Sequence, residues 1–137
     1  MSTASPIDVA RDFCANFGPT HGDAVTTCKR LVHPEVNWQS FIFNDCPVES
    51  LDALLDDLRR AREVMGAEGF SIDVHRVQAE GNVVLMHRTD KILDAEGKLL
   101  DTLDMMSMLR IEDGKIVWSR DCFFDSRKLT DAWSSRG

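Results

Sequence analysis

The chain has 137 residues, of which 43% are hydrophobic and 28% charged, and its formal net charge is −7. This length suits one domain, residues 1–137, with a core large enough to enclose a cavity. The acidic balance argues against a nucleic-acid partner, because phosphate binding needs a clustered basic surface. No segment has the unbroken apolar length of a membrane span, so we do not expect a membrane protein.

The N-terminus and the cysteines bear on location. Residues 1–6 are small and polar, without the basic start or the apolar stretch of a signal peptide. The four cysteines are scattered and form no CxxC pair, which favours reduced thiols over a disulfide framework or a zinc site. These features predict a cytoplasmic protein.

The apolar spacing of helices recurs in three segments, residues 6–17, 23–32 and 51–65. Gly18-Pro19 ends the first helix and His33-Pro34 ends the second, because proline and the residue before it disfavour helical backbone. Ser50 is placed to cap the third helix, which carries an apolar stripe opposite charged residues. A short helix over residues 128–133 is expected near the end of the chain.

Strands are predicted first over residues 36–43, which are rich in aromatic and branched side chains. Four longer strands follow the third helix, over residues 70–78, 82–93, 99–111 and 115–124. Turns that contain glycine separate these four, as in successive antiparallel hairpins. Helices followed by a strand meander predict an α+β domain. Its curved, mixed and mostly antiparallel sheet would carry the N-terminal helices on the concave face and enclose a pocket.

Two of the predicted strands carry a carboxylate inside an apolar stretch. Because side chains alternate across a strand, Arg88 and Asp90 share a face of one strand, and Asp121 lies on the last strand. In a cavity, Arg88 could hold one aspartate ionised while desolvation keeps the other protonated, giving a base and an acid. On spacing alone, ordinary exposed ion pairs are favoured, with Asp121 pairing to Arg120 or Arg127.

Other polar residues leave alternatives open. On the first strand, Trp38 and Ser40 share one face and Asn37 and Gln39 the other, so either pair could bind a water or simply face solvent. The four histidines do not form a spaced ligand set with neighbouring acids, which leaves a metal site unsupported. Asp104 receives no role. The sequence contains neither a GxSxG motif nor a phosphate-binding glycine loop. Nucleophilic catalysis by a serine or cysteine is therefore not expected.

Three motifs carry a resemblance to a known family: Arg88-Thr89-Asp90, Gly114-Lys115-Ile116 and Arg120-Asp121-Cys122-Phe123. At these positions the chain resembles the limonene-1,2-epoxide hydrolase family, within the larger SnoaL-like and nuclear-transport-factor-2-like fold group. That family carries Arg-x-Asp on one strand and Arg-Asp followed by aromatic residues on a later one. A helix-rich first half and a strand-rich second half agree as well, so the resemblance covers nearly the whole chain.

The resemblance implies hydrolysis of a small apolar epoxide to a vicinal diol in one step. Asp121 would deprotonate the attacking water, Asp90 would protonate the leaving oxygen, and Arg88 would orient both. No metal or organic cofactor is implied, and a homodimer formed through the outer face of the sheet is expected. By the same resemblance, the candidates for the apolar pocket wall are Ile92, Leu103, Met105 and Phe123.

The first strand departs from the family pattern. The family holds the water with a Tyr and an Asn on either side of a Gln, whereas this chain has no Tyr. Keeping the Gln in register places Trp38 and Ser40 at those positions, and a slip of one residue would substitute Asn37 and Gln39. Trp donates but does not accept a hydrogen bond, and Ser is shorter than Asn. An isomerase or cyclase of the same fold and a noncatalytic small-ligand binding module therefore stay open as alternatives.

Overall fold

The computed structural model describes residues 4–40 and 46–124. The elements in chain order are α1 (Pro6–Asn16), α2 (His21–Leu31), β1 (Val32–Ser40), α3 (Leu51–Met65), β2 (Gly69–Glu80), β3 (Val83–Leu93), β4 (Leu99–Glu112) and β5 (Lys115–Phe123). The expected order of helices and strands is thus confirmed, with shifts of a few residues at the ends. The helix expected over residues 128–133 and the end of the first predicted strand, 41–43, lie outside the described residues.

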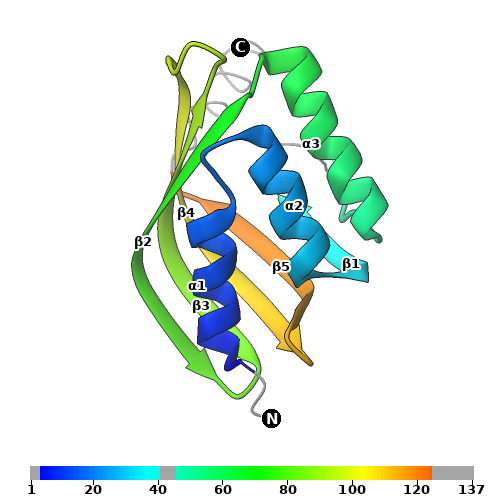
Figure 1. The fold of residues 1–137 in the computed structure, drawn as a ribbon. Coiled ribbons are helices and arrows are strands. Elements are labelled where there is room, and N and C mark those ends of the chain that lie inside the picture. Colours follow the sequence, from blue (N-terminus) through cyan, green and yellow to red (C-terminus); the bar gives the residue numbers. More distant parts are fainter. Residues whose placement is uncertain (1–3, 41–45, 125–137) are drawn as a thin grey trace, which may run out of the picture.

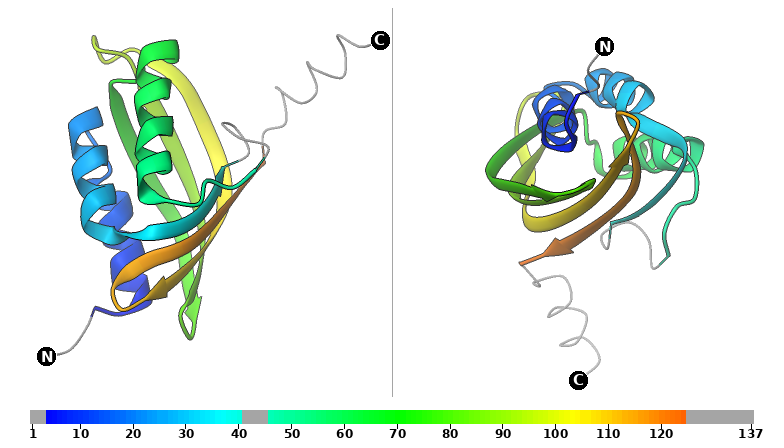
Figure 2. Two further views of the ribbon diagram at one scale, coloured as in Figure 1. Left: turned by 90° about the vertical axis from the view of Figure 1, so that its right-hand side faces the viewer. Right: turned by 90° about the horizontal axis from the view of Figure 1, so that it is seen from below.

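The strands form one five-stranded sheet in the order β1-β5-β4-β3-β2. β1 pairs with β5 in parallel, and the other neighbours pair antiparallel. The sheet curves strongly, and α1 and α2 pack on its concave side, with α3 beside them near β1 (Figures 1 and 2). This arrangement confirms the predicted α+β fold with helices on the concave face.

Each helix begins at a polar cap that satisfies free backbone N–H groups. The side chains of Ser5 and Ser50 accept hydrogen bonds from the first turns of α1 and α3. α2 begins at His21, earlier than expected, because Thr20 and Asp23 form a reciprocal capping box. The caps therefore set where the helices start against the sheet.

β1 starts at Val32, directly after α2, rather than at residue 36 as expected from the sequence. Pro34 lies inside the strand, where it cannot donate a ladder hydrogen bond. β1 is an edge strand, and its register with β5 shifts between Val32 and Asn37, which is where proline is tolerated.

A tight turn and a close backbone contact constrain how β4, β5 and α1 are positioned. Asp113 and Gly114 both have positive φ, 50° and 76°, in the turn that joins β4 to β5. Gly18 follows α1 so closely against β2 that an added Cβ would lie 1.9 Å from the carbonyl oxygen of Phe70. A glycine is therefore required at Gly18 for α1 to approach the sheet.

The core lies between α1, α2 and the concave face, where Phe13 meets inward side chains of the sheet. Its largest fully buried members include Phe13, Met86, Leu109 and Ile116. Across residues 4–40 and 46–124, no helix combines the length and apolar character required to cross a bilayer.

Candidate active site

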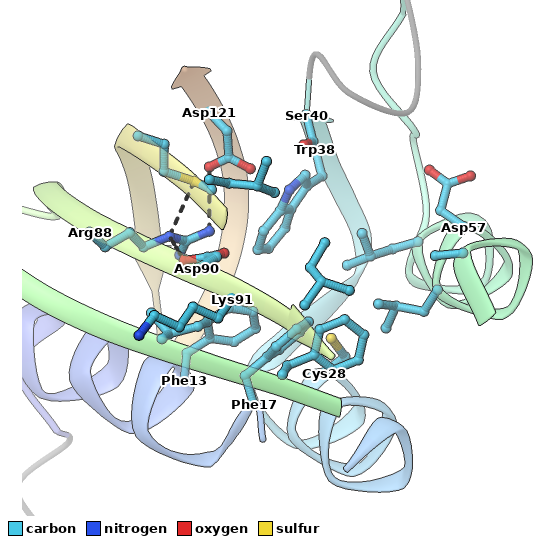
Figure 3. A pocket seen from close by; sticks show the side chains of 18 of the residues that line it. Phe13, Phe17, Cys28, Trp38, Ser40, Asp57, Arg88, Asp90, Lys91 and Asp121 are labelled. Carbon is cyan, nitrogen blue, oxygen red and sulfur yellow. Dashed lines mark hydrogen bonds and ion pairs between the residues drawn. The ribbon is translucent and has the colours of Figure 1, made fainter. Parts of the chain in front are cut away.

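A cavity opens between the concave face of the sheet and the three helices (Figure 3). Its volume is about 110 Å³, counted as the space open to the centres of water-sized molecules. This is room for several waters, or for a small organic molecule with a water. All the residues predicted for the site line this cavity: Trp38, Ser40, Arg88, Asp90, Ile92, Leu103, Met105, Asp121 and Phe123.

Arg88 lies between the two aspartates on the floor of the cavity (Figure 3). Its Nε is 3.2 Å from Oδ1 of Asp90, and its Nη2 is 3.7 Å from Oδ1 of Asp121. Arg88 and Asp121 are each only 3% exposed. The exposed ion pair favoured on spacing alone for Arg88 and Asp90 is therefore wrong, because their side chains lie on the strand face that is turned toward the cavity, while Arg127, a candidate partner of Asp121, lies outside the described residues. Arg120 instead lies over the Trp118 ring, 4.3 Å from its centroid.

Asp90 has the proton affinity of an acid catalyst. Burial raises its pKa to about 6, and the neighbouring charge of Asp121 adds to that rise, while Arg88 opposes it. The approach of Arg88 to Oδ1 is close enough for an ion pair but lacks the alignment of a hydrogen bond. Within the described part of the chain, that oxygen has no hydrogen-bond partner. Asp90 is thus placed to carry a proton into an apolar cavity.

Asp121 has a different set of partners. The hydroxyl of Ser107 donates a hydrogen bond of 2.7 Å to Oδ1 of Asp121, the same oxygen that faces Arg88. Ser107 lies directly opposite Asp121 in the β4–β5 ladder and is itself buried. Both contacts hold one carboxylate oxygen, which orients the other for a substrate or water. Ser107 was not predicted from the sequence, because the β4–β5 register shifts between Arg110 and Ile111, and a register counted from the Asp113-Gly114 turn would place Met106 opposite Asp121 instead.

The first strand presents Trp38 and Ser40 to the cavity, whereas Asn37 and Gln39 do not line it. Ser40 is the register partner of Asp121 in the parallel β1–β5 pair, so the two lie side by side. The Trp38 backbone forms two hydrogen bonds with Val48, of 2.9 and 2.8 Å. These bonds fix the strand where it borders the cavity.

The helices supply walls that the sequence did not identify. The ring of Phe13 lies 5.6 Å from that of Trp38, and Phe17 packs against Phe70 at 5.1 Å. Below them, the Cys14 thiol contacts Nη1 of Arg88 at 3.8 Å, and burial raises the pKa of this thiol. These contacts join α1 to the strands across long stretches of sequence, so no local pattern could reveal them.

The opposite face of the sheet carries a second polar cluster. His75, His87 and Asp104 present ligand atoms that all lie within 4.8 Å of one another. The spacing of the histidines along the chain left a metal site unsupported, and the structure brings two of them close to Asp104. The three residues come from three strands, so their proximity is not visible in the spacing along the chain.

Comparison with known proteins agrees with the fold. A family model described as a SnoaL-like domain matches residues 10–119. Epoxide hydrolase EphG of Mycobacterium tuberculosis is 34% identical over 62 residues, which make up 45% of this chain and 40% of that protein. The match thus spans less than half of this curated relative.

Solved structures extend the likeness over almost the whole chain. A LEH-like epoxide hydrolase from M. tuberculosis superposes with a TM-score of 0.71 at 22% identity, covering 94% of this chain and 89% of that one. IdmH, a proposed polyketide cyclase from Streptomyces antibioticus, gives 0.70 at 14% identity, covering 95% and 99%. At such identities, these structures show a shared nuclear-transport-factor-2-like fold alone. The family match itself extends from α1 into β5, and the chain belongs to the SnoaL-like domain family.

Proposed function

We propose that this protein hydrolyses a small, mainly apolar epoxide to a vicinal diol in one step, without a covalent intermediate or a cofactor. The observation that carries the proposal is the arrangement of Arg88 between buried Asp121 and partly buried Asp90 in an apolar cavity. An epoxide hydrolase of this type needs one carboxylate that accepts a proton and one carboxyl that donates it. The raised pKa of Asp90, about 6, provides the donor.

The step balances with these two residues alone. Asp121 takes a proton from a water as the water oxygen bonds to one ring carbon. The bond between that carbon and the epoxide oxygen breaks, and the oxygen takes the proton of Asp90. The reaction ends with Asp121 protonated and Asp90 ionised, so one net proton transfer from Asp121 to Asp90 resets the site.

Arg88 stabilises the ionised aspartate both before and after the chemical step. Before the step its charge faces ionised Asp121, and after the step it faces ionised Asp90, at distances of 3.7 and 3.2 Å. Because Arg88 is buried, its interactions with both acids are only weakly screened. A fixed cation between the acids therefore stabilises the movement of negative charge from one to the other.

The water is best placed beside Asp121 and Ser40, which neighbour each other across the β1–β5 pair. Ser40 can both donate and accept a hydrogen bond, and Trp38 can only donate one. Asp121 would therefore act as the main acceptor for the water. The hydrogen bond from Ser107 holds the carboxylate in the required orientation.

The substrate class follows from the cavity wall. Ile92, Leu103, Met105 and Phe123 surround the acids with apolar surface, and Phe13 covers them from α1. Such a wall selects a hydrocarbon-like epoxide by burial rather than by hydrogen bonding. The partial identity to an epoxide hydrolase supports an epoxide as the substrate.

Diol formation from a panel of terpene, cyclohexene and styrene-type epoxides tests the proposal. The native chain should turn over at least one of them, and Asp121→Asn should lower kcat by about 10²- to 10⁴-fold. Asp113→Asn is the matched control. It removes a carboxylate in the β4–β5 turn, where Asn tolerates the positive φ of 50°. Equal turnover by native protein and Asp121→Asn would refute the assigned base.

Trp38 favours a second candidate, an isomerase or cyclase that moves a proton on a cyclic substrate with a single aspartate. A Trp beside the base cannot accept a hydrogen bond from water, which makes water a less obvious reactant than in the epoxide hydrolase pattern. Incubation in ¹⁸O-labelled water separates the two reactions, because only hydrolysis places the label in the product. A folded protein that binds ligands and turns over none of either class would indicate a noncatalytic binding module.

We also propose that the protein forms a homodimer through the outer face of the sheet. Leu85, Met106 and Met108 lie on this face and are 42%, 37% and 41% exposed. Adjacent exposed apolar side chains on one face are typical of an interface between proteins. Light scattering should give the mass of two chains, and Met108→Glu should shift it toward one chain. A native mass of one chain at micromolar concentration would contradict the dimer.

A further inference from the structure

Three titratable side chains gather on the outer face of the sheet, opposite the cavity. Nε2 of His87 lies 2.8 Å from Oδ1 of Asp104, and Nε2 of His75 lies 2.7 Å from Oγ1 of Thr89. Thr89 in turn donates a hydrogen bond of 3.1 Å to Asp104. The two imidazole rings are 4.7 Å apart between centroids. The cluster therefore has two histidines and a carboxylate whose ligand atoms all lie within 4.8 Å of one another.

The architecture of the sheet explains why these residues meet. Asp104 on β4 lies opposite Thr89 on β3. Thr89 is two residues from His87 on the same strand, so both side chains lie on the outer face. On β2, the register shifts between Val74 and Arg76, so that His75 occupies a bulge beside His87. A bulge redirects side chains and often occurs next to functional sites. Three adjacent strands thus contribute one ligand each.

The spacing of the ligand atoms suits a metal ion. All three atoms lie within 4.8 Å of one another, and His87 and Asp104 are as close as 2.8 Å. A tetrahedral zinc ion with bonds of about 2.0–2.1 Å holds its ligand atoms roughly 3.3 Å apart. The required shift is small, and the side chains of His87 and Asp104 are 33% and 44% exposed, which leaves space for the adjustment.

We propose that His75, His87 and Asp104 bind a divalent transition-metal ion of the zinc class on the outer face of the sheet. Imidazole nitrogens with one carboxylate suit zinc, cobalt, nickel and copper, whereas magnesium and calcium prefer oxygen ligands throughout. Thr89 contacts both Asp104 and His75 and orients these two ligands. The ring of Phe124 packs edge-on against His87 at 5.4 Å and supports that ligand.

This site is separate from the catalytic proposal. Successive residues of β3 point to opposite faces, so His87 faces outward while Arg88 faces the cavity. One chain supplies all three ligands, and a fourth position is left for water or another donor. The ion would join β2, β3 and β4 at their middle.

Titration of the tag-free full chain with Zn²⁺ tests the site by calorimetry. We expect saturation at one ion per chain, and His75→Ala, His87→Ala and Asp104→Asn should each raise Kd by at least about tenfold. His33→Ala is the matched control, since it removes a histidine of β1 outside the cluster. Failure to saturate at one ion per chain, or unchanged affinity in the His87→Ala variant, would overturn the proposal.

A second measurement does not depend on whether the variants fold. In the native chain, NMR signals of the His75 and His87 rings should shift or broaden together on addition of Zn²⁺, and those of His21 and His33 should stay in place. Co²⁺ should give visible absorption bands of a site with nitrogen and oxygen ligands. Ring signals that respond equally in all four histidines would indicate scattered surface binding and contradict the site.

Discussion

Two aspartates on neighbouring strands, Asp90 of β3 and Asp104 of β4, show opposite proton affinities. Asp90 faces the cavity, and desolvation raises its pKa to about 6 even though Arg88 is adjacent. Asp104 faces outward, and its hydrogen bond to His87 lowers its pKa. Both carboxylates have a basic partner, so the partner does not decide the direction. Burial does, because the low-polarity cavity penalises the ionised form more than one ion pair compensates.

The two faces of this one sheet therefore suit different chemistry. The inner face holds a carboxyl that can carry a proton near neutral pH, which suits acid catalysis. The outer face holds a carboxylate that remains ionised, which suits a metal ligand. Single substitutions on the inner or the outer face of these strands can therefore test the two faces separately.

The largest effect is expected from removing the buried cation. Arg88→Met leaves Asp90 and Asp121 in the cavity without their shared partner, and should lower the free energy of unfolding by about 3–5 kcal/mol. Arg110→Met is the outer-face control. It breaks an exposed ion pair with Glu112, 3.7 Å long, and should cost less than about 1 kcal/mol. Urea denaturation measures both, and equal losses would show that the inner pair is not buried.

Asp90→Asn should stabilise the protein while removing activity. The raised pKa means that the folded state binds this proton more tightly than the unfolded state, so ionisation of Asp90 costs stability. The cost is absent below pH about 3.8, grows up to pH about 6 and is complete above that. An amide avoids it, and the gain at pH 8 should be about 2–3 kcal/mol.

The outer-face counterpart, Asp104→Asn, should change stability in the opposite direction. The pKa of Asp104 is lower in the folded protein than in the unfolded chain, so its ionised form stabilises the fold. This stabilisation is present above the pKa of the unfolded chain and is lost as the pH falls through the pKa of the folded protein. Thermal unfolding of both variants from pH 3 to pH 8 checks the signs. A stabilisation of the same sign at both positions would contradict the contrast between the faces.

A smaller effect is expected from the Ser107 hydroxyl, which is bonded to Asp121, the proposed base. Ser107→Ala leaves a buried oxygen of Asp121 without its hydrogen bond, and should cost about 1–3 kcal/mol. Turnover of the epoxide should fall with little change in KM, because the residue positions the base and lies behind it. Ser119→Ala is the matched control on the same face. The Ser119 hydroxyl is buried without a hydrogen-bond partner within the described ranges, so its removal should be neutral or stabilising. Equal losses for both serines would contradict the positioning role.

The fold could be predicted well because its signals are local. Apolar spacing identified the helices, and glycine turns separated the strands. The early start of β1 was missed, because Pro34 normally interrupts a strand. It is tolerated here at a sheet edge, and edge position depends on the order of all five strands.

The site was predicted in part. Alternation placed Arg88 and Asp90 on one face, and the family resemblance joined them to Asp121. Spacing does not say which face of a strand is buried, which is why exposed ion pairs were favoured. Ser107 lies opposite Asp121, and His75 reaches His87 through a bulge, so both depend on strand register. Register requires a correct pairing of the strands, which the sequence alone did not supply.

The role of Asp90 as proton donor depends on its raised pKa, about 6, beside Arg88 in the cavity. The ionisable groups on the elements around it are Arg88, Asp121 and Cys14, with Cys28, Lys91 and Asp57 also on the cavity wall. A ¹³C NMR titration of the aspartate carboxyls, with Asp90 assigned by its loss in Asp90→Asn, measures this pKa directly. We expect a pKa of about 6 for Asp90, falling in Asp121→Asn because the like charge is removed. A pKa at or below the ordinary value of 3.8 would contradict the assignment of Asp90 as the acid.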